Sequence, residues 1–126
     1  METKATKIIR VGIGLLLMFG GLSKFVAIGP QPQHNEIGTA FLTALVATGY
    51  MMPIIGAVEL LAGAAFVTGR FVALAAVLLA PISLNIVLFH VCLDPADAIP
   101  GFVVGIANVY LLAVNLPKYQ DMLMPK

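Results

Sequence analysis

Polar side chains interrupt the apolar stretches of this sequence at a few positions, and these are the residues with which it could do chemistry: Lys24, Glu59, Asn85, His90 and Asn108. A carboxyl group surrounded by apolar sequence, as at Glu59, costs about 3 kcal/mol at the centre of a lipid bilayer, so it is a functional candidate. Such a group must either hold a proton or lie beside a cation, and Lys24 is a candidate cation. A carboxyl and an amide held together could hydrogen-bond a carbonyl ligand or relay its proton.

Other kinds of site are excluded by the residues present. Cys92 is the only cysteine, which excludes an intrachain disulfide, a Cys-x-x-Cys redox pair and a thiolate zinc site. Bis-histidine haem ligation needs two buried histidines that face each other, and only His90 lies in an apolar segment. The chain has no glycine-rich phosphate loop and no basic face for nucleic acid. We therefore expect no catalytic residue, no metal site, no cofactor beyond a non-covalent ligand, and no autonomous enzyme activity.

Composition indicates a membrane protein. Of the 126 residues, 60 % are hydrophobic and 10 % are charged, and the mean hydropathy is +1.02. A soluble domain carries about 25 % charged residues. This chain therefore has too few charged residues to form a surface that is exposed to water. We predict an all-α integral membrane protein with a single domain over residues 1–126, surrounded by lipid.

Long apolar segments predict a four-helix transmembrane bundle. About 20 residues, rising 1.5 Å each, span the hydrocarbon core of a bilayer, which is about 30 Å thick. The turn that follows the first span is rich in proline and contains His34, which we expect to be solvated. The apolar segment after this turn is too short to cross and predicts a short interfacial helix at about residues 37–49. The predicted spans are at about residues 8–28, 51–68, 71–93 and 99–116.

The basic residues predict the orientation, because cytoplasmic loops of membrane proteins carry an excess of Lys and Arg. With four spans, both termini and the turn at Gly69-Arg70 share one side of the membrane. The opposite side has Lys24 as its only basic residue, beside three acidic residues. We therefore predict that both termini are cytoplasmic. The basic residues on their side are Lys4, Lys7, Arg10, Arg70, Lys118 and Lys126.

Counting along the predicted helices places Glu59, Asn85 and Asn108 at one level, close to the bilayer midplane. At 100° per residue, Glu59 and Asn108 each share a helix face with small residues, which mark surfaces of close helix approach in lipid. Both side chains are therefore predicted to point into the bundle. Lys24 and His90 lie nearer the outer surface. His90 is about 140° away from Asn85 around the helix, so these two cannot both face its axis.

Each of these residues also has a purely structural explanation. A pair between Glu59 and Lys24, or a hydrogen bond from Glu59 to an asparagine, would fasten helices without any ligand. Asn85 and Asn108 would form interhelical hydrogen bonds. Lys24 would be an interfacial anchor, and His90 would bond to the neighbouring loop.

Three segments carry a family resemblance: Gly20-Gly-Leu-Ser-Lys-Phe25, Gly49-Tyr-Met-Met-Pro-Ile-Ile-Gly-Ala-Val-Glu-Leu-Leu-Ala-Gly63 and Ala80-Pro-Ile-Ser-Leu-Asn-Ile-Val-Leu-Phe-His90. With these segments the chain resembles the DoxX or DoxX-like family of small bacterial membrane proteins, over nearly its whole length. The resemblance implies a four-helix fold in the bacterial inner (cytoplasmic) membrane. Its pattern maps onto Lys24, Glu59, Asn85 and His90. Family relatives are similar to membrane subunits of thiosulfate:quinone oxidoreductases and to redox-linked membrane complexes.

We expect an accessory or ligand-binding subunit linked to membrane redox processes, which binds quinone or lipid near Glu59. The alternative is a structural or chaperone-like partner of another membrane protein, with no ligand chemistry of its own. Proton- or ion-coupled transport ranks last, because four short helices in one copy leave little room for a pathway. The expected partners are the lipid bilayer, a membrane or redox protein, and a further copy of the chain in a homo-oligomer, but no nucleic acid.

Overall fold

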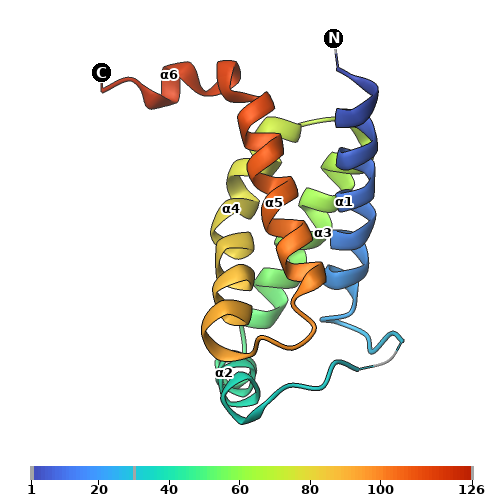
Figure 1. The fold of residues 1–126 in the computed structure, drawn as a ribbon, viewed down its shortest axis with the longest axis vertical. Coiled ribbons are helices and arrows are strands. Elements are labelled where there is room, and N and C mark those ends of the chain that lie inside the picture. The colour runs from blue at the N-terminus through green and yellow to red at the C-terminus, as the bar shows by residue number, and fades with distance from the viewer. Residues whose placement is uncertain (1, 30, 126) are drawn as a thin grey trace.

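The computed structural model describes residues 2–29 and 31–125, and all regular structure in those residues is helical. The long helices run alternately along the long axis of the molecule, so both ends of the chain lie at one end of the bundle (Figure 1). We call this the terminal end, and the opposite end, which carries the short helix α2, the loop end. The long helices are α1 (Lys4–Leu22), α3 (Met51–Thr68), α4 (Val72–Leu88) and α5 (Ile99–Val114).

A core of apolar side chains runs through the bundle. Helix α1 packs chiefly against α3, α4 packs against α5, and α3 joins the two pairs by its contact with α4. The largest apolar side chains of this core are fully buried, one from each long helix. They hold the helices in register, and they are Leu17, Phe66, Leu79 and Leu111.

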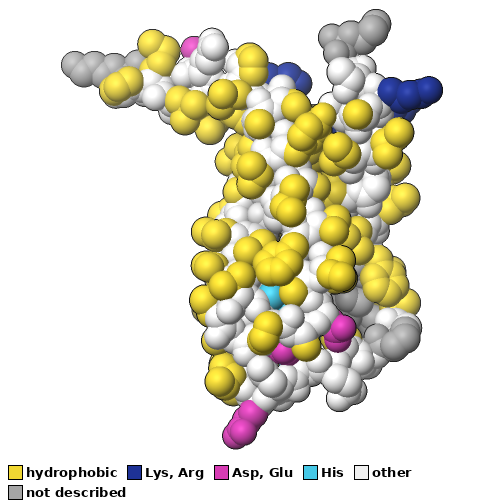
Figure 2. Space-filling model, viewed as in Figure 1, with side chains coloured by type: hydrophobic (Ala, Val, Ile, Leu, Met, Phe, Trp, Pro, Cys, Tyr) yellow, Lys and Arg dark blue, Asp and Glu magenta, His cyan; other side chains and the backbone are white. Residues whose placement is uncertain are grey.

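Large apolar side chains also cover the outside of the bundle. Leu61 is 73 % exposed and Ile106 is 72 % exposed, and Figure 2 shows hydrophobic groups along the sides. Such a surface is expected where lipid, not water, is the solvent. Three helices in the described residues are long and apolar enough to cross a membrane, and a fourth qualifies if α5 and the segment after it, bent by 72°, form one span. The chain is a small helical membrane protein.

The helix limits agree with the sequence prediction in one region and differ in another. Helix α3 covers Met51–Thr68, the range predicted for the second span. Helix α1 begins at Lys4 and ends at Leu22, six residues before the predicted end at residue 28. The hydroxyl of Ser23 donates to the Gly20 carbonyl at 2.7 Å, which takes up an acceptor at the helix end. Lys24 therefore lies in the turn after α1 and not within a helix.

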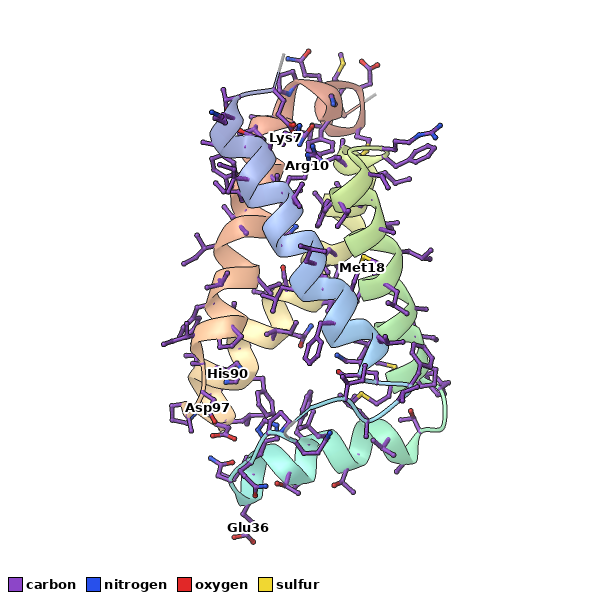
Figure 3. The ribbon with its side chains drawn as sticks, turned by 90° about the vertical axis from the view of Figure 1, so that its right-hand side faces the viewer. Lys7, Arg10, Met18, Glu36, His90 and Asp97 are labelled. Carbon is purple, nitrogen blue, oxygen red and sulfur yellow. The ribbon has the colours of Figure 1, made fainter. Side chains whose placement is uncertain are left out.

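A short apolar helix, α2 (Glu36–Ala47), lies across the loop end (Figure 3). The side chain of Asn35 caps its first turn by accepting a hydrogen bond from the Gly38 amide at 2.7 Å. Gly38 is the one buried residue of this helix among those described, and Ile37 is 60 % exposed. Helix α2 thus covers the end of the bundle while most of its own apolar side chains remain on the surface.

The connections at the two ends of α4 differ in kind. At the terminal end, Gly69 and Phe71 both have left-handed backbones, with φ of 77° and 59°, and they turn α3 directly into α4. At the loop end, α4 continues into η1 (Phe89–Leu93), a π-helical turn. In this turn the Asp94 amide donates to the Phe89 carbonyl at 2.9 Å, five residues back. The longer turn rotates the side chains that follow relative to an α-helix of 100° per residue.

After α5 the chain turns away from the bundle through η2 (Leu116–Tyr119) and α6 (Gln120–Leu123) (Figure 1). Pro117 lies at the start of η2, where it cannot continue the α-helical hydrogen bonds of α5. The Tyr119 hydroxyl donates to the Ala73 carbonyl at 2.7 Å, and this bond ties the segment to the first turn of α4. Lys118 is thereby held close to the N-terminal ends of α1 and α4.

Candidate functional site

A lysine–glutamate ion pair joins the end of α1 to the middle of α3. Glu59 is only 3 % exposed, and its Oε1 atom lies 2.6 Å from the Nζ atom of Lys24. The same ammonium donates to the Gly20 carbonyl at 3.3 Å. The side chain of Lys24 is 22 % exposed, against 5 % for that of Glu59. The pair is therefore sealed on its carboxylate side and reaches the surface of the bundle on its ammonium side.

Glycines allow this pair to form, because they bring the backbones of α1 and α3 together. A methyl group added at Gly20 would lie 3.1 Å from Oε2 of Glu59, and one added at Gly21 would lie 2.8 Å from the Gly56 carbonyl oxygen. A methyl group at Gly56 would lie 3.2 Å from Cβ of Lys24. Any larger side chain would separate the helices or displace the carboxylate.

The carboxylate of Glu59 is not fully hydrogen-bonded. Among the described residues, none donates a well-oriented hydrogen bond to its buried Oε1, although the Lys24 ammonium lies at ion-pair distance. The contact is therefore a close ion pair with poor hydrogen-bond direction. Burying an ion costs several kcal/mol, and an ion pair repays that cost only when the remaining acceptor positions are satisfied. Oε1 keeps acceptor capacity that a proton or a donor group could use.

Asn108 belongs to a separate hydrogen-bonded group between α4 and α5. It is 1 % exposed, so the prediction that it points into the bundle is confirmed. Its Oδ1 atom accepts from the Ser83 hydroxyl at 2.7 Å, and its Nδ2 atom donates to the Ala76 carbonyl at 3.0 Å. The oxygen and the nitrogen of the amide both hold α5 against α4. This is the interhelical hydrogen bonding given above as the structural explanation of Asn108.

Asn85 and His90 lie apart from the ion pair and from each other. The side chain of Asn85 is on the exposed face of α4, where its amide donates to the Pro81 carbonyl at 2.9 Å. The Nδ1 atom of His90 lies 3.0 Å from the backbone oxygen of Asp94. The His90 ring also packs against α5, since a methyl group at Gly101 would meet its Cδ2 atom at 2.7 Å. The five predicted polar residues therefore lie at four separate positions and not in one site, and only Lys24 and Glu59 meet.

The expectation that His34 is solvated is wrong. Its Nδ1 atom lies 2.9 Å from Oδ2 of Asp94, whose side chain is 3 % exposed. The Asn35 amide donates to the same oxygen at 3.1 Å, and the His34 ring meets the ring of Phe89 edge-on at 5.4 Å. The buried carboxylate of Asp94 needs these donors, so it draws the turn before α2 onto the end of η1. Asp94 was not among the candidate site residues of the sequence.

Comparison with known families shows to which family this chain belongs. The family model for DoxX matches residues 5–91, well over half of the chain. The chain belongs to the DoxX family. The matched residues include Lys24, Glu59, Asn85 and His90, whereas Asn108 lies beyond them. No curated protein and no solved structure matched the chain in the corresponding comparisons.

This DoxX chain also has a buried arginine that the sequence analysis used only to assign orientation. Arg10 on α1 is 6 % exposed, and its Nε and Nη2 atoms donate to the two carboxylate oxygens of Glu2 at 2.8 and 3.0 Å. Its Nη1 atom donates to the backbone oxygen of Phe66, and to that of Val67 at 3.4 Å. A spacing signal was present, because Arg10 falls on the buried face of α1 with Thr6, Ile13, Gly14 and Leu17.

Of these groups in the DoxX chain, the Lys24–Glu59 pair has the most unused binding capacity. The Asn108 group and the His34–Asp94 group both pair their polar atoms with protein atoms, whereas Oε1 of Glu59 lacks a well-oriented donor. The ammonium of Lys24 can donate, and the carboxylate of Glu59 can accept. An adjacent donor and acceptor can bind a ligand that carries both carbonyl and hydroxyl oxygens.

Proposed function

We propose that this DoxX protein crosses the bacterial inner membrane four times, with α2 at the outer interface and both termini in the cytoplasm. Helix α5, which runs beside the other long helices, supports its assignment as the fourth span (Figure 1). The charges support the orientation, because Lys7 and Arg10 lie at the terminal end and Glu36 and Asp97 lie at the loop end (Figure 3). Basic residues are retained on the cytoplasmic side during insertion.

Within this framework we propose an accessory subunit of a membrane redox system that binds a quinone head group at Lys24 and Glu59. The observation that carries the proposal is the buried Glu59 carboxylate, 2.6 Å from a partly exposed ammonium and short of hydrogen-bond donors. The Lys24 ammonium, which reaches the surface of the bundle, donates to a quinone carbonyl oxygen, and the buried Glu59 carboxylate behind it holds the ammonium in place. The apolar tail of the ligand lies in the surrounding lipid, which needs no large cavity inside the bundle.

The test begins with the protein purified in mild detergent. Quinones and lipids are extracted and identified, and the melting temperature is measured with and without a short-chain quinone. A ligand at about 100 times its Kd stabilises the folded state by about 2.7 kcal/mol, which is a measurable shift. Glu59→Gln keeps the size of the side chain and removes its charge, so it should abolish the shift. Asn85→Ala, on the exposed face of α4, is the matched control and should retain it.

A wild-type protein that yields no quinone and melts at the same temperature with added quinone would overturn this proposal. A second candidate function then follows from the same pair, because Lys24 and Glu59 also fasten α1 to α3. In that case the protein is a structural or chaperone-like partner of another membrane protein, and co-purification from native membranes should identify the partner.

Two further variants separate the candidates. Lys24→Met leaves the Glu59 carboxylate buried without its partner and should cost about 3–5 kcal/mol of stability, whereas Glu59→Leu leaves only the partly exposed ammonium and should cost less. The double variant removes both charges and should recover most of that loss. If the pair binds quinone, the recovered double variant is folded but shows no quinone shift. If the pair only fastens helices, the double variant also keeps the association with its partner.

A further inference from the structure

A cavity lies at the terminal end, at the opposite end of α1 from the Lys24–Glu59 pair. It has a volume of about 770 Å³ and opens between the first turns of α1, the start of α4 and the end of α5. Figure 2 shows a hollow at this end, between the C-terminal segment and the start of α1. The polar residues of its lining include Glu2, Thr6, Arg10, Asn115 and Lys118, and the apolar ones include Phe71, Val72, Leu74, Leu111 and Val114.

The lining of the cavity contains a guanidinium group that already holds an anion. Arg10 presents its Nε and Nη2 edge to both oxygens of the Glu2 carboxylate, while Nη1 is fixed by backbone oxygens at the end of α3. The side chain of Glu2 is 37 % exposed, against 8 % for that of Arg10. The guanidinium therefore lies at the floor of the cavity, and the carboxylate that covers it comes from the N-terminal tail at the mouth.

The positive charge around the cavity exceeds the single negative charge of Glu2. The hydrogen bond from Arg10 lowers the pKa of Glu2 below its usual value, although the slight burial of the carboxyl group acts to raise it. The positive charges of Arg10, Lys7 and Lys118 lower the pKa further. Three cations thus act on one carboxylate. Because this carboxylate belongs to an exposed tail residue, a stronger anion can replace it without unfolding a helix.

We propose that this cavity binds the anionic head group of a phospholipid. The phosphate takes the place of the Glu2 carboxylate on the Nε–Nη2 edge of Arg10, since a guanidinium binds both groups through two parallel hydrogen bonds. Lys118 contacts the head group from the opposite side, and the first acyl methylene groups lie along Phe71 and Val114. Glu2 acts as an internal competitor for the same edge. This site is independent of the proposed quinone site.

The experiment compares lipids that differ in head-group charge. The protein is prepared in nanodiscs with phosphatidylglycerol or phosphatidylcholine, and bound lipid is counted by native mass spectrometry after release into detergent. The wild-type protein should retain phosphatidylglycerol selectively. Lys118→Gln should reduce this retention about fivefold, the effect of one basic residue near an anionic head group. Arg70→Gln is the matched control, because Arg70 lies at the same end and is exposed, but it does not line the cavity.

Changes at Glu2 and Arg10 test the competition directly. Glu2→Gln removes the internal anion and should increase phosphatidylglycerol retention. Non-specific attraction between the protein and a charged bilayer would produce only a small increase. Arg10→Lys keeps the charge but not the forked geometry and should lower retention. The Glu2→Gln result keeps the proposal testable if Arg10→Lys fails to fold.

The results that would overturn the proposal are equal retention of the two lipids, an equal effect of Arg70→Gln and Lys118→Gln, or weaker retention in Glu2→Gln. Inorganic phosphate serves as the soluble-anion probe. If phosphate raises the melting temperature as much as phosphatidylglycerol does, the site binds soluble anions and the proposal of a lipid site is wrong.

Discussion

The imidazole Nδ1 atom of His34 lies 2.9 Å from the Asp94 carboxylate, although the two residues are 60 positions apart in the sequence. This bond joins the turn before α2 to the end of η1. Asn35 strengthens the junction, because its side-chain amide donates to the Leu93 carbonyl at 2.7 Å. Helix α2 is thus attached to the bundle through polar contacts at its N-terminal end, while most of its apolar side chains remain exposed.

Asp94→Asn should lower the stability of the protein and flatten its dependence on acid pH. Burial alone would raise the pKa of Asp94, but hydrogen bonds from His34 and from the Asn35 and Ala96 amides outweigh it, so the pKa lies below the usual 3.8. The folded state therefore favours the ionised carboxylate. Its contribution is complete above the usual pKa and is lost as the pH falls through the lowered value. Melting temperatures measured between about pH 7 and about pH 2 test this expectation.

The control for this change is Asp97→Asn. Asp97 is exposed and has a left-handed backbone with φ of 54°, a conformation that asparagine tolerates. This variant should melt like the wild type at each pH. An Asp94→Asn protein with an unchanged acid slope would show that the ionised carboxylate does not stabilise the junction.

Asn108→Ala should destabilise the bundle by about 1–2 kcal/mol, since interhelical hydrogen bonds in membranes contribute about 0.6 kcal/mol on average and at most about 1.7 kcal/mol each. The change removes the bonds to Ser83 and Ala76 and leaves a small void between α4 and α5. Unfolding in mixed detergent micelles measures the loss. Asn85→Ala is the same chemical change on the exposed face of α4 and should alter stability by less than about 0.5 kcal/mol. Equal losses for both variants would refute the assigned positions of the two amides.

Gly63→Ala should destabilise the contact between α1 and α3 by about 1–3 kcal/mol, as overpacking of a well-packed interior does. The added methyl group would lie 2.7 Å from the Gly14 carbonyl oxygen and 2.7 Å from Cγ of Met18, so the backbone itself would have to move. Gly12→Ala provides the comparison on α1, because no atom lies within 4 Å of its added methyl group. This variant should be neutral or more stable, by up to about 1 kcal/mol, since alanine favours a helix. The same unfolding assay ranks the two.

The proposed orientation predicts the labelling of single cysteines. With Cys92→Ser as the background, Glu36→Cys at the loop end and Asp121→Cys at the terminal end each introduce one exposed thiol. A membrane-impermeant maleimide should label Glu36→Cys in cells whose outer membrane has been permeabilised. Asp121→Cys should react only after lysis. The reverse pattern would invert the orientation, and labelling of both thiols before lysis would exclude a four-span arrangement.

Much of the framework could be predicted from residue types and their spacing. Apolar segments separated by proline, glycine and charged residues predict helices and turns, because a helix in lipid must satisfy its own backbone hydrogen bonds. The limits of α3 were predictable for this reason. The small residues that accompany Glu59 and Asn108 also predicted their inward direction, since close helix contact in lipid requires small side chains.

Other features of the candidate site could not be predicted in this way. Asn85 was predicted at the same level as Glu59 and Asn108, but it faces outward. Periodicity relates residues on one helix and does not define which face meets the other helices. Lys24 was predicted within the first span but lies in a turn, because α1 ends at Leu22. At this end the Ser23 hydroxyl donates to the carbonyl of Gly20. Arg10 had a detectable position on the buried face of α1, but its partner Glu2 comes from outside the helix.

The sequence by itself determined that the chain is helical, that it belongs in a membrane, and that Glu59 and Asn108 point inward, because composition and helical period act locally. Only the tertiary structure decided which charges meet: Lys24 with Glu59, His34 with Asp94, and Arg10 with Glu2. Each buried charge needs a partner, but several partners were available along the chain. For Lys24 and Glu59, the close packing of α1 and α3 that Gly20 and Gly56 permit brings the two charges together.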